Sequence, residues 1–355
     1  MKLEILRKKL AEQQVDAILI TNTYNRKYIT GFTGSTGAAL VSQSDALFLT
    51  DFRYIDQATS QCVGYEIIDV ASTKGDYPAL IQEKAKALGI KKLAFEQDEM
   101  TFATHKKYAE KFEGELVPTS GLVEDLRKFK TAEEIAILQT AADIADAAFN
   151  HILGFIKPGL SEMEVANELE FFMRKAGATS SSFGMIVASG WRSALPHGVA
   201  TDKVIEKGDM LTLDFGAYYN YYASDMTRTI AVGDPGEKLK EIYDIVLEAQ
   251  LNVNEKLRPG ITCKEADALA RDIITAKGYG KYFGHGLGHG VGLEVHEAPT
   301  LSFKSEEKLA AGMVVTNEPG IYIPDLGGVR IEDDLVLTED GNYSLTISTK
   351  ELIIL

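Results

Sequence analysis

The sequence has no long apolar run, few cysteines and no excess of positive charge. No stretch approaches the roughly 20 apolar residues of a membrane-spanning helix. The opening residues MKLEILRKKLAEQQ space their leucines as an amphipathic helix does, without the apolar core of a signal peptide. The two cysteines, Cys62 and Cys263, are too few and too far apart for a disulfide framework, which favours a reducing compartment. These absences predict a cytoplasmic protein without a membrane partner.

The charge balance argues against another class of partner. The chain carries 37 Lys and Arg against 52 Asp and Glu, a formal net charge of −15. Non-specific binding to the phosphates of nucleic acids is therefore not expected. With 355 residues, of which 45% are hydrophobic, the chain can bury a full core and has the length of two domains.

The sequence pattern changes near residue 124. Before it, short β-like runs (VDAILIT, ALFLT, YEIIDV, KLAFE) alternate with helical stretches such as DYPALIQEKAKAL, which predicts an α/β domain over residues 1–124. The charged segment EDLRKFKTAEE then leads into a long Ala-rich helix that opens on a capping box of Thr131 and Glu134. A second domain is therefore expected over residues 125–355.

The second part contains a weak internal repeat. KPGLSEMEVANELEFFMRKAG from Lys157 matches RPGITCKEADALARDIITAKG from Arg258 at an offset of 101 residues. Each copy has a Pro-Gly stop, a Ser or Thr cap, a helix and a closing Gly. Two unrelated amphipathic helices with the same start and stop residues would also match in this way, and that alternative stays open. If the repeat is real, this domain is a pseudo-symmetric pair of α/β halves, and a site at their seam would draw ligands from both.

Charged side chains interrupt several segments that otherwise have the pattern of buried strands. An ionised carboxylate in an apolar strand is costly unless it is paired or bound to a metal. A hairpin turning near Tyr219 and Asn220 would bring two of these carboxylates together, and a second hairpin-like pair, VVTNEPGIYI and GVRIEDDLVL, would supply two more. One such residue alone is more often a solvated surface charge, but together they predict a dinuclear metal site formed by Asp214, Asp225, His289, Glu318 and Glu332.

The Gly-rich segment GHGLGHGVGLEVHE contains three of the six histidines: His285, His289 and His296. It lacks the Lys and Ser/Thr of a phosphate-binding P-loop, so phosphate binding is the weaker interpretation. Its glycines would allow the backbone to approach a ligand closely. His197, in LPHGVAT, stands alone and by default has a structural role.

Together, LTLDFGAYY, ASDMTR, HGLGHGVGLEVHE, TNEPGIY and GVRIEDD closely resemble the metallopeptidase superfamily of aminopeptidase P, prolidase and methionine aminopeptidase. The resemblance implies an α/β (α+β) protein, with an N-terminal creatinase-like α/β domain and a C-terminal, pseudo-symmetric catalytic domain of the pita-bread fold. ITGFTGSTGAALV followed by LTDFRYIDQA looks more like aminopeptidase P than like prolidase.

The resemblance also implies roles for the residues. Asp214 and Asp225 would chelate one metal, His289 and Glu318 would complete the other, and Asp225 and Glu332 would bridge both. The expected cofactor is two divalent ions, Mn²⁺ first, with Co²⁺ or Zn²⁺ as alternatives. Glu318 would accept and relay the proton of a metal-bound water. Three histidines would act on the substrate: His296 would stabilise the carbonyl or the oxyanion, and His197 and His285 would hold substrate or shuttle protons. Arg330 would orient Glu332 or hold a substrate carboxylate.

The predicted activity is hydrolysis of the bond between an N-terminal residue and a following proline, in short peptides with proline in second position. The closest alternative is an Xaa-Pro dipeptidase (prolidase). Methionine aminopeptidase fits less well because of the extra N-terminal domain and the TNEPGIY context. A metal-free creatinase-like hydrolase or a non-catalytic binding module of this fold would lack the five ligands. A homodimer is expected from the resemblance, with Arg53 of the DFRY segment as a contributor to the partner's site.

Overall fold

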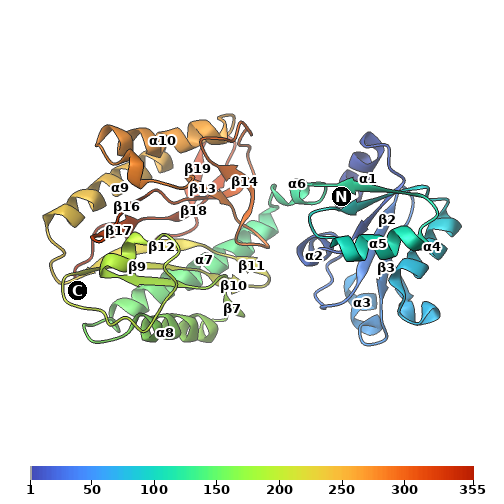
Figure 1. The fold of residues 1–355 in the computed structure, drawn as a ribbon, viewed down its shortest axis with the longest axis horizontal. Helices are drawn as coiled ribbons and strands as arrows, with labels where there is room; N and C mark the ends of the chain where they lie inside the picture. Colours follow the sequence, from blue (N-terminus) through green and yellow to red (C-terminus); the bar gives the residue numbers. More distant parts are fainter. Residues whose placement is uncertain (1) are drawn as a thin grey trace. The chain divides into compact units, whose positions relative to one another are not determined.

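The computed structural model describes residues 2–355, which divide into two compact units, one ending at Arg127 and the other beginning at Lys128. The sequence pattern predicts the boundary after residue 124, three residues before the observed one. Figure 1 shows both units as ribbons. Within residues 2–355 no helix combines the length and the apolar character needed to cross a membrane.

The first unit is an α/β layer structure around a six-stranded sheet of order β4-β3-β2-β1-β5-β6. β1 pairs antiparallel with β2 and parallel with β5. Its strands are β1 (Ala17–Ile20), β2 (Ala38–Ser42), β3 (Ala46–Thr50), β4 (Glu66–Asp69), β5 (Lys92–Glu96) and β6 (Glu115–Thr119). Its helices are α1 (Lys2–Glu12), α2 (Thr23–Thr30), α3 (Ile55–Gln61), the 3₁₀-helix η1 (Val70–Thr73), α4 (Tyr77–Leu88), α5 (Phe102–Lys111) and α6 (Glu124–Arg127).

Two hydrophobic clusters cover the two faces of this sheet. One contains the buried side chains of α4 and α5, and the other contains those of α1, α2, α3 and α6. The amphipathic N-terminal helix predicted from the leucine spacing is α1, with Leu6 and Leu10 fully buried. The four predicted strands and the helix α4 are also present, so the α/β prediction for this unit is confirmed.

The second unit has two pairs of helices around a set of mainly antiparallel strands. Its helices are α7 (Ala132–Leu153), α8 (Glu162–Lys175), η2 (Gly190–Ala194), α9 (Glu237–Lys256), α10 (Cys263–Ala276) and η3 (Gly280–Tyr282). Its strands are β7 (Ser180–Ser181), β8 (Ile186–Ser189), β9 (Asp209–Phe215), β10 (Ala217–Tyr219), β11 (Tyr222–Ala223), β12 (Met226–Val232), β13 (Gly288–Gly290), β14 (Glu297–Leu301), β15 (Val314–Asn317), β16 (Gly320–Ile323), β17 (Gly327–Arg330), β18 (Asp333–Leu337) and β19 (Asn342–Ser344).

The internal repeat corresponds to a structural one. α8 and α10 each open on a complete capping box, Ser161 with Glu164 and Thr262 with Glu265, and each follows a longer helix, α7 or α9. A three-stranded sheet, β12-β9-β8, belongs to the first half (α7 to β12), and a five-stranded sheet, β14-β13-β15-β18-β19, to the second half (α9 to β19). In Figure 1, α7 and α8 lie on one side of the central strands and α9 and α10 on the other. The pseudo-symmetric arrangement is therefore confirmed.

Two hairpins bring the predicted ligand segments together. β10 pairs with β11 around a turn in which Asn220 and Tyr221 have positive φ, where the sequence predicted the turn. β9 then pairs with β12 so that Asp214 lies opposite Thr227. In the second half, β15 pairs with β18, and β16 pairs with β17.

Candidate metal centre

All five predicted ligands lie on strands or directly beside strand ends of the second unit. Asp214 is on β9, Asp225 directly precedes β12, and His289 is on β13. Glu318 directly follows β15, and Glu332 lies between β17 and β18. Two of the five therefore come from the first half and three from the second, as expected for a site at the seam.

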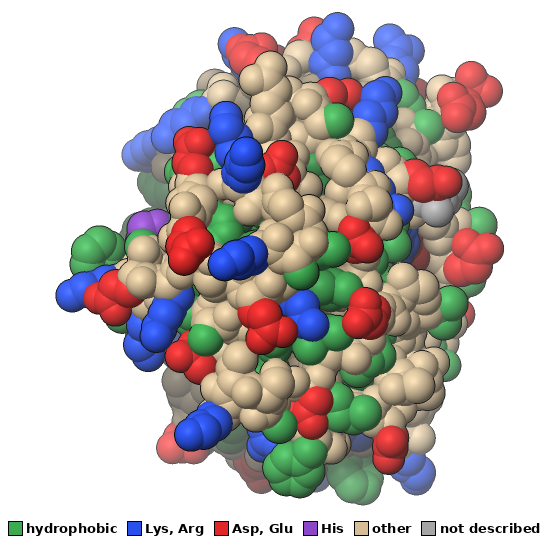
Figure 2. Space-filling model, turned by 90° about the vertical axis from the view of Figure 1, so that its right-hand side faces the viewer, with side chains coloured by type: hydrophobic (Ala, Val, Ile, Leu, Met, Phe, Trp, Pro, Cys, Tyr) green, Lys and Arg blue, Asp and Glu red, His purple; other side chains and the backbone are tan. Residues whose placement is uncertain are grey.

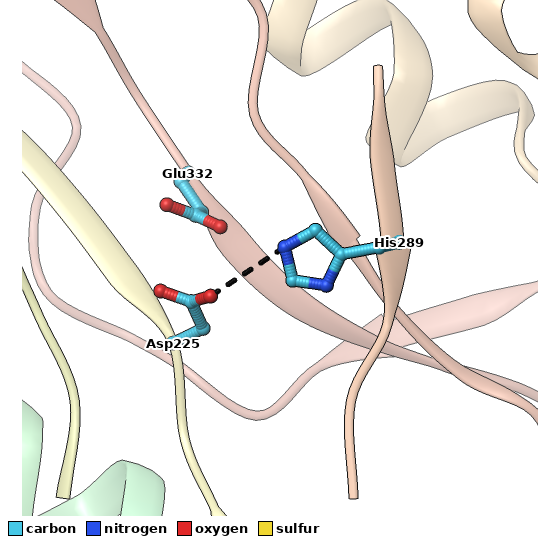
Figure 3. A group of neighbouring side chains, drawn as sticks. All are labelled: Asp225, His289 and Glu332. Carbon is cyan, nitrogen blue, oxygen red and sulfur yellow. Dashed lines mark ion pairs between the residues drawn. The ribbon is translucent and has the colours of Figure 1, made fainter. Parts of the chain in front are cut away.

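Three of these side chains converge on one point. Asp225, His289 and Glu332 each offer one ligand atom, and these atoms all lie within 4.8 Å of one another. Figure 3 shows the two carboxylates facing the imidazole, with His289 Nε2 3.7 Å from Asp225 Oδ2. The Nδ1 atom of His289 is 3.1 Å from the Gly290 carbonyl oxygen. A carbonyl only accepts, so Nδ1 donates to it and Nε2 is the nitrogen directed at the carboxylates.

Glu318 joins the group through the same imidazole. Its Oε1 lies 3.3 Å from His289 Nε2 and accepts a hydrogen bond of 3.1 Å from the Thr316 hydroxyl. Burial alone would raise the pKa of Glu318, but the contact with His289 and the surrounding positive charges lower it to about 2. Glu318 is therefore an ionised carboxylate at neutral pH.

Asp214 is held by Arg330. The Arg330 Nη2 atom donates to Asp214 Oδ2 at 2.6 Å, and both side chains are nearly buried. Arg330 also donates from Nε to the Thr227 hydroxyl at 3.0 Å and from Nη1 to the Tyr322 hydroxyl at 2.9 Å. The guanidinium thus fixes one oxygen of Asp214 from outside the ligand group.

Two carboxylate oxygens of the site are buried without a hydrogen-bond partner, Asp214 Oδ1 and Glu332 Oε1. Burial raises the pKa of both Asp225 and Glu332 well above their ordinary values, and neighbouring carboxylates raise them further. Because no protein donor reaches these oxygens, their charge is offset only by protonation or by a bound cation. Four carboxylates and one imidazole are ligands that suit divalent ions such as Mn²⁺ or Zn²⁺. The residues present therefore fit a divalent metal centre.

Two of the three predicted catalytic histidines lie at the exposed side of this group. The rings of His296 and His289 have centroids 4.3 Å apart at an interplanar angle of 65°. Partial burial, together with the charges of His289 and His197, lowers the pKa of His296. His296 and His197 are both exposed. They are therefore available to a bound molecule.

His285 contacts the site indirectly. Its Nδ1 donates to the Gly286 carbonyl oxygen at 2.7 Å, so its Nε2 accepts from the Tyr322 hydroxyl at 2.9 Å. The Tyr322 oxygen in turn accepts from Arg330, which completes a hydrogen-bonded chain from His285 to Asp214.

Three residues around the ligands were missed by the sequence analysis: Asp334, Thr227 and Tyr322. Asp334 Oδ2 accepts from the Asp225 backbone N–H at 2.9 Å, and burial raises the pKa of Asp334 to about 7. The Thr227 hydroxyl donates to Glu332 Oε2 at 2.6 Å. Asp334 could have been found from its position two residues after Glu332 in an apolar strand pattern, whereas Thr227 and Tyr322 carry no signal of this kind.

The family follows from a comparison with known proteins. Residues 136–339 match the model of metallopeptidase family M24. The chain belongs to metallopeptidase family M24. Residues 2–129 match the creatinase/prolidase N-terminal domain, so this M24 metallopeptidase has the two-domain organisation and the fold that its sequence motifs predicted. Membership also implies that divalent metal ions are its cofactor.

Similar proteins of this family include both dipeptidases and an aminopeptidase. A solved Xaa-Pro dipeptidase from Bacillus anthracis is 60% identical, with a TM-score of 0.98 and coverage of 100% of this chain and 99% of that chain. The Xaa-Pro dipeptidase of Pyrococcus furiosus is 43% identical over 99% of both chains. A solved X-Pro aminopeptidase from Thermotoga maritima is 39% identical, with a TM-score of 0.90 and coverage of 96% and 98%.

Proposed function

We propose that this M24 metallopeptidase hydrolyses the bond between an N-terminal residue and a following proline in short peptides. The observation that carries the proposal is the convergence of Asp225, His289 and Glu332, flanked by Asp214 and Glu318, at the seam of the two halves. The names of the relatives support the choice of substrate, since both the dipeptidases and the aminopeptidase act before proline.

The five ligands would hold two divalent ions, of which Mn²⁺ is our first choice and Co²⁺ or Zn²⁺ the alternatives. Such ions supply a hydroxide from bound water at neutral pH and polarise the scissile carbonyl. Asp225 and Glu332 are the proposed bridging ligands. Glu318 is the proposed proton acceptor and relay.

The histidines are assigned to the substrate. His296, exposed beside His289, would donate to the carbonyl oxygen or to the oxyanion that forms from it. His197, whose charge acts on His296, would hold the substrate or move a proton. Proline has no N–H once it is in a peptide bond, so its ring nitrogen must be protonated when the bond breaks. His285 would exert its effect through Tyr322 and Arg330.

The treatment of the proline carboxyl end distinguishes two candidate activities. Identities of 60% and 43% to Xaa-Pro dipeptidases favour a dipeptidase. One of the two roles predicted for Arg330 was to bind a substrate carboxylate. Arg330 is only 3% exposed, however, and its Nε and both terminal nitrogens donate to protein atoms. An arginine engaged in this way is not available to a dipeptide carboxylate, and this observation favours the aminopeptidase, which leaves that side open.

Peptide substrates of different length, assayed with added Mn²⁺, test both the cleavage before proline and the choice between dipeptidase and aminopeptidase. Ala-Pro, Ala-Pro-Ala and the control Ala-Ala would be compared with the purified full-length protein. We expect both proline peptides to be cleaved before proline and Ala-Ala to be a poor substrate. Cleavage of Ala-Pro alone would identify a dipeptidase, and faster cleavage of Ala-Pro-Ala an aminopeptidase. No hydrolysis with Mn²⁺, Co²⁺ or Zn²⁺ would contradict the proposal.

We further propose a cytoplasmic location and a homodimer, with no nucleic acid or membrane partner. The two reduced cysteines and the net charge of −15 support the location and the absence of a nucleic acid partner. Arg53, proposed as a contributor to the partner's site, is half exposed and forms a two-pronged ion pair with Asp51 at 2.8 Å.

A further inference from the structure

A cavity separate from the candidate metal centre lies entirely within the first unit. It has a volume of about 370 Å³, which is in the range of small-molecule sites, and it is partly open to solvent. Its walls come from the end of β1, the helix α2, the loop that leads into β2, the N-terminal turn of α4 and the side of α5. Two cationic side chains, Arg26 and Lys107, line it together with tyrosine, threonine and serine hydroxyls.

Arg26 is a buried cation without an anionic partner. Only 4% of the residue is exposed, and its Nη1 and Nη2 atoms donate to the Gly37 and Gly34 carbonyl oxygens at 2.7 and 2.9 Å. Its Nε has no hydrogen-bond partner, and within residues 2–355 it forms no ion pair. A buried charge is ordinarily paired, because neutral dipoles alone compensate its desolvation poorly.

Glu96, a carboxylate whose charge partly offsets the lowering of the Arg26 pKa by burial, is already engaged elsewhere. Glu96 accepts from the backbone N–H groups of Thr21 and Asn22, both at 2.7 Å, and from the Asn25 side chain at 2.8 Å. These bonds hold the Glu96 carboxylate at the end of β1. It therefore does not form an ion pair with Arg26.

Two further polar groups at the cavity have no partner in the described part of the chain. The Tyr77 hydroxyl, at the first residue of α4, is buried and without a hydrogen bond. Lys107, on α5, is exposed and forms no ion pair with any of residues 2–355. Arg26, Tyr77 and Lys107 come from three different helices and line the same cavity.

The surface charge of this unit does not explain why Arg26, Tyr77 and Lys107 meet at the cavity. Figure 2 shows basic and acidic side chains interspersed over this face, with hydrophobic side chains between them. Holding the loop of Gly34 and Gly37 accounts for two nitrogens of Arg26. These two hydrogen bonds do not balance the positive charge of Arg26, and they provide no partner for its Nε or for the Tyr77 hydroxyl.

We propose that this cavity binds a small organic anion, whose carboxylate or phosphate oxygens are held by Arg26, Tyr77 and Lys107. Oxygens of either group match the donors of a guanidinium, an ammonium and a phenol. Pro78 and Ala38, together with the tyrosine rings, provide apolar walls for a compact ligand body. The site goes beyond the proposed peptidase activity and does not depend on it.

Isothermal titration of the full-length holoenzyme with benzoate, benzamide and inorganic phosphate tests the proposal. Benzamide has the shape of benzoate without its charge, so we expect benzoate to bind and benzamide not to. Tighter binding of phosphate than of benzoate would identify a phosphate ester as the ligand class, and the reverse order would identify an organic carboxylate. Equal binding of benzamide and benzoate, or no binding of either anion, would overturn the proposal.

Variants locate the bound anion. Lys107→Ala should weaken anion binding about fivefold, and Tyr77→Phe, which keeps the ring, roughly two- to tenfold. Lys106→Ala, next to Lys107 on α5 and outside the cavity, is the matched control and should have no effect. Arg26→Met should abolish binding, but Lys107 and Tyr77 decide the question if that variant does not fold. Anion binding that neither Lys107→Ala nor Tyr77→Phe changes would lie elsewhere and would refute the assignment.

Discussion

Arg330 and Asp214 form a buried ion pair in which one carboxylate oxygen is bound and the other is left without a partner. The Arg330 Nη2 atom lies 2.6 Å from Asp214 Oδ2, while Asp214 Oδ1 has no hydrogen bond. The pair joins β17 of the second half to β9 of the first. Arg330 thereby fixes the orientation of Asp214, whose remaining oxygen would then be free to bind a metal.

Replacing Arg330 should therefore weaken metal binding without removing a ligand. For Arg330→Met we expect a loss of about 10- to 100-fold in metal affinity, the range seen when an outer partner of a ligand is removed. Calorimetric titration of the metal-free variant with Mn²⁺ measures this affinity. Arg174→Met removes an exposed arginine paired with Glu170 and is the matched control. An unchanged affinity in Arg330→Met would show that Asp214 is not a ligand or does not need orienting.

Removal of either proposed bridging ligand should have a larger effect. Glu332→Ala or Asp225→Ala should lower kcat/KM by more than about 100-fold, because a bridging carboxylate would hold both metals and their bound water. The variants should still fold, since each removes one of several mutually repelling buried carboxylates. Circular dichroism checks the fold, with exposed Glu339→Ala as control. Retained activity in either bridge variant would mean that the site is misassigned.

The two neighbouring histidines should separate chemistry from metal binding. His296→Ala should keep its metal yet lower kcat and kcat/KM together by roughly 10²- to 10³-fold, as expected for a donor used mainly in the transition state. His289→Ala should instead lose metal, with activity partly recovered at high Mn²⁺. Metal content by elemental analysis distinguishes them. Equal metal loss in both variants would contradict the division of roles.

Chelation should change how stability depends on pH. Burial raises the folded-state pKa of Asp225 and Glu332 well above their ordinary values, and that of Asp334 to about 7. A carboxyl whose folded pKa is raised contributes stability below its unfolded pKa of about 4, and this contribution is lost as pH rises through the folded value.

The chelated protein should accordingly melt at a lower temperature at about pH 8 than at about pH 5.5. Added Mn²⁺ should remove most of that difference, because the metal replaces the protons that the carboxylates otherwise need. Thermal denaturation with and without chelator measures both effects. A chelated protein that is more stable at the higher pH would contradict the assignment of these carboxylates as a repelling buried group.

Local signals explain what could be predicted from the sequence. The helix that begins after Thr131 was predictable because its capping box lies within four consecutive residues. The seam was predictable because two copies of the same cap recur 101 residues apart. The strand β6 was not predicted. Pro118 interrupts its pattern, and a proline is tolerated there because β6 is the edge strand of the sheet.

Contacts between distant segments explain what could not be predicted. The sequence left two roles open for Arg330, orienting Glu332 or holding a substrate carboxylate, but its guanidinium donates instead to Asp214, 116 residues away in the chain. The hydrogen bond from Thr227 to Glu332 likewise depends on the packing of β12 beside the end of β17. The cavity at Arg26 depends on three helices meeting, and no spacing in the sequence indicates it.

The division of the ligands between the two halves has a consequence for the mechanics of the molecule. Asp214 and Asp225 belong to the first half, whereas His289, Glu318 and Glu332 belong to the second. A metal ion held by ligands from both halves would link them across the seam, and its affinity would depend on how closely the halves are held together. A substitution that loosens the packing of α7 or α9 should release metal before any helix or strand is lost. Metal retention is thus a more sensitive gauge of damage to this domain than its secondary structure.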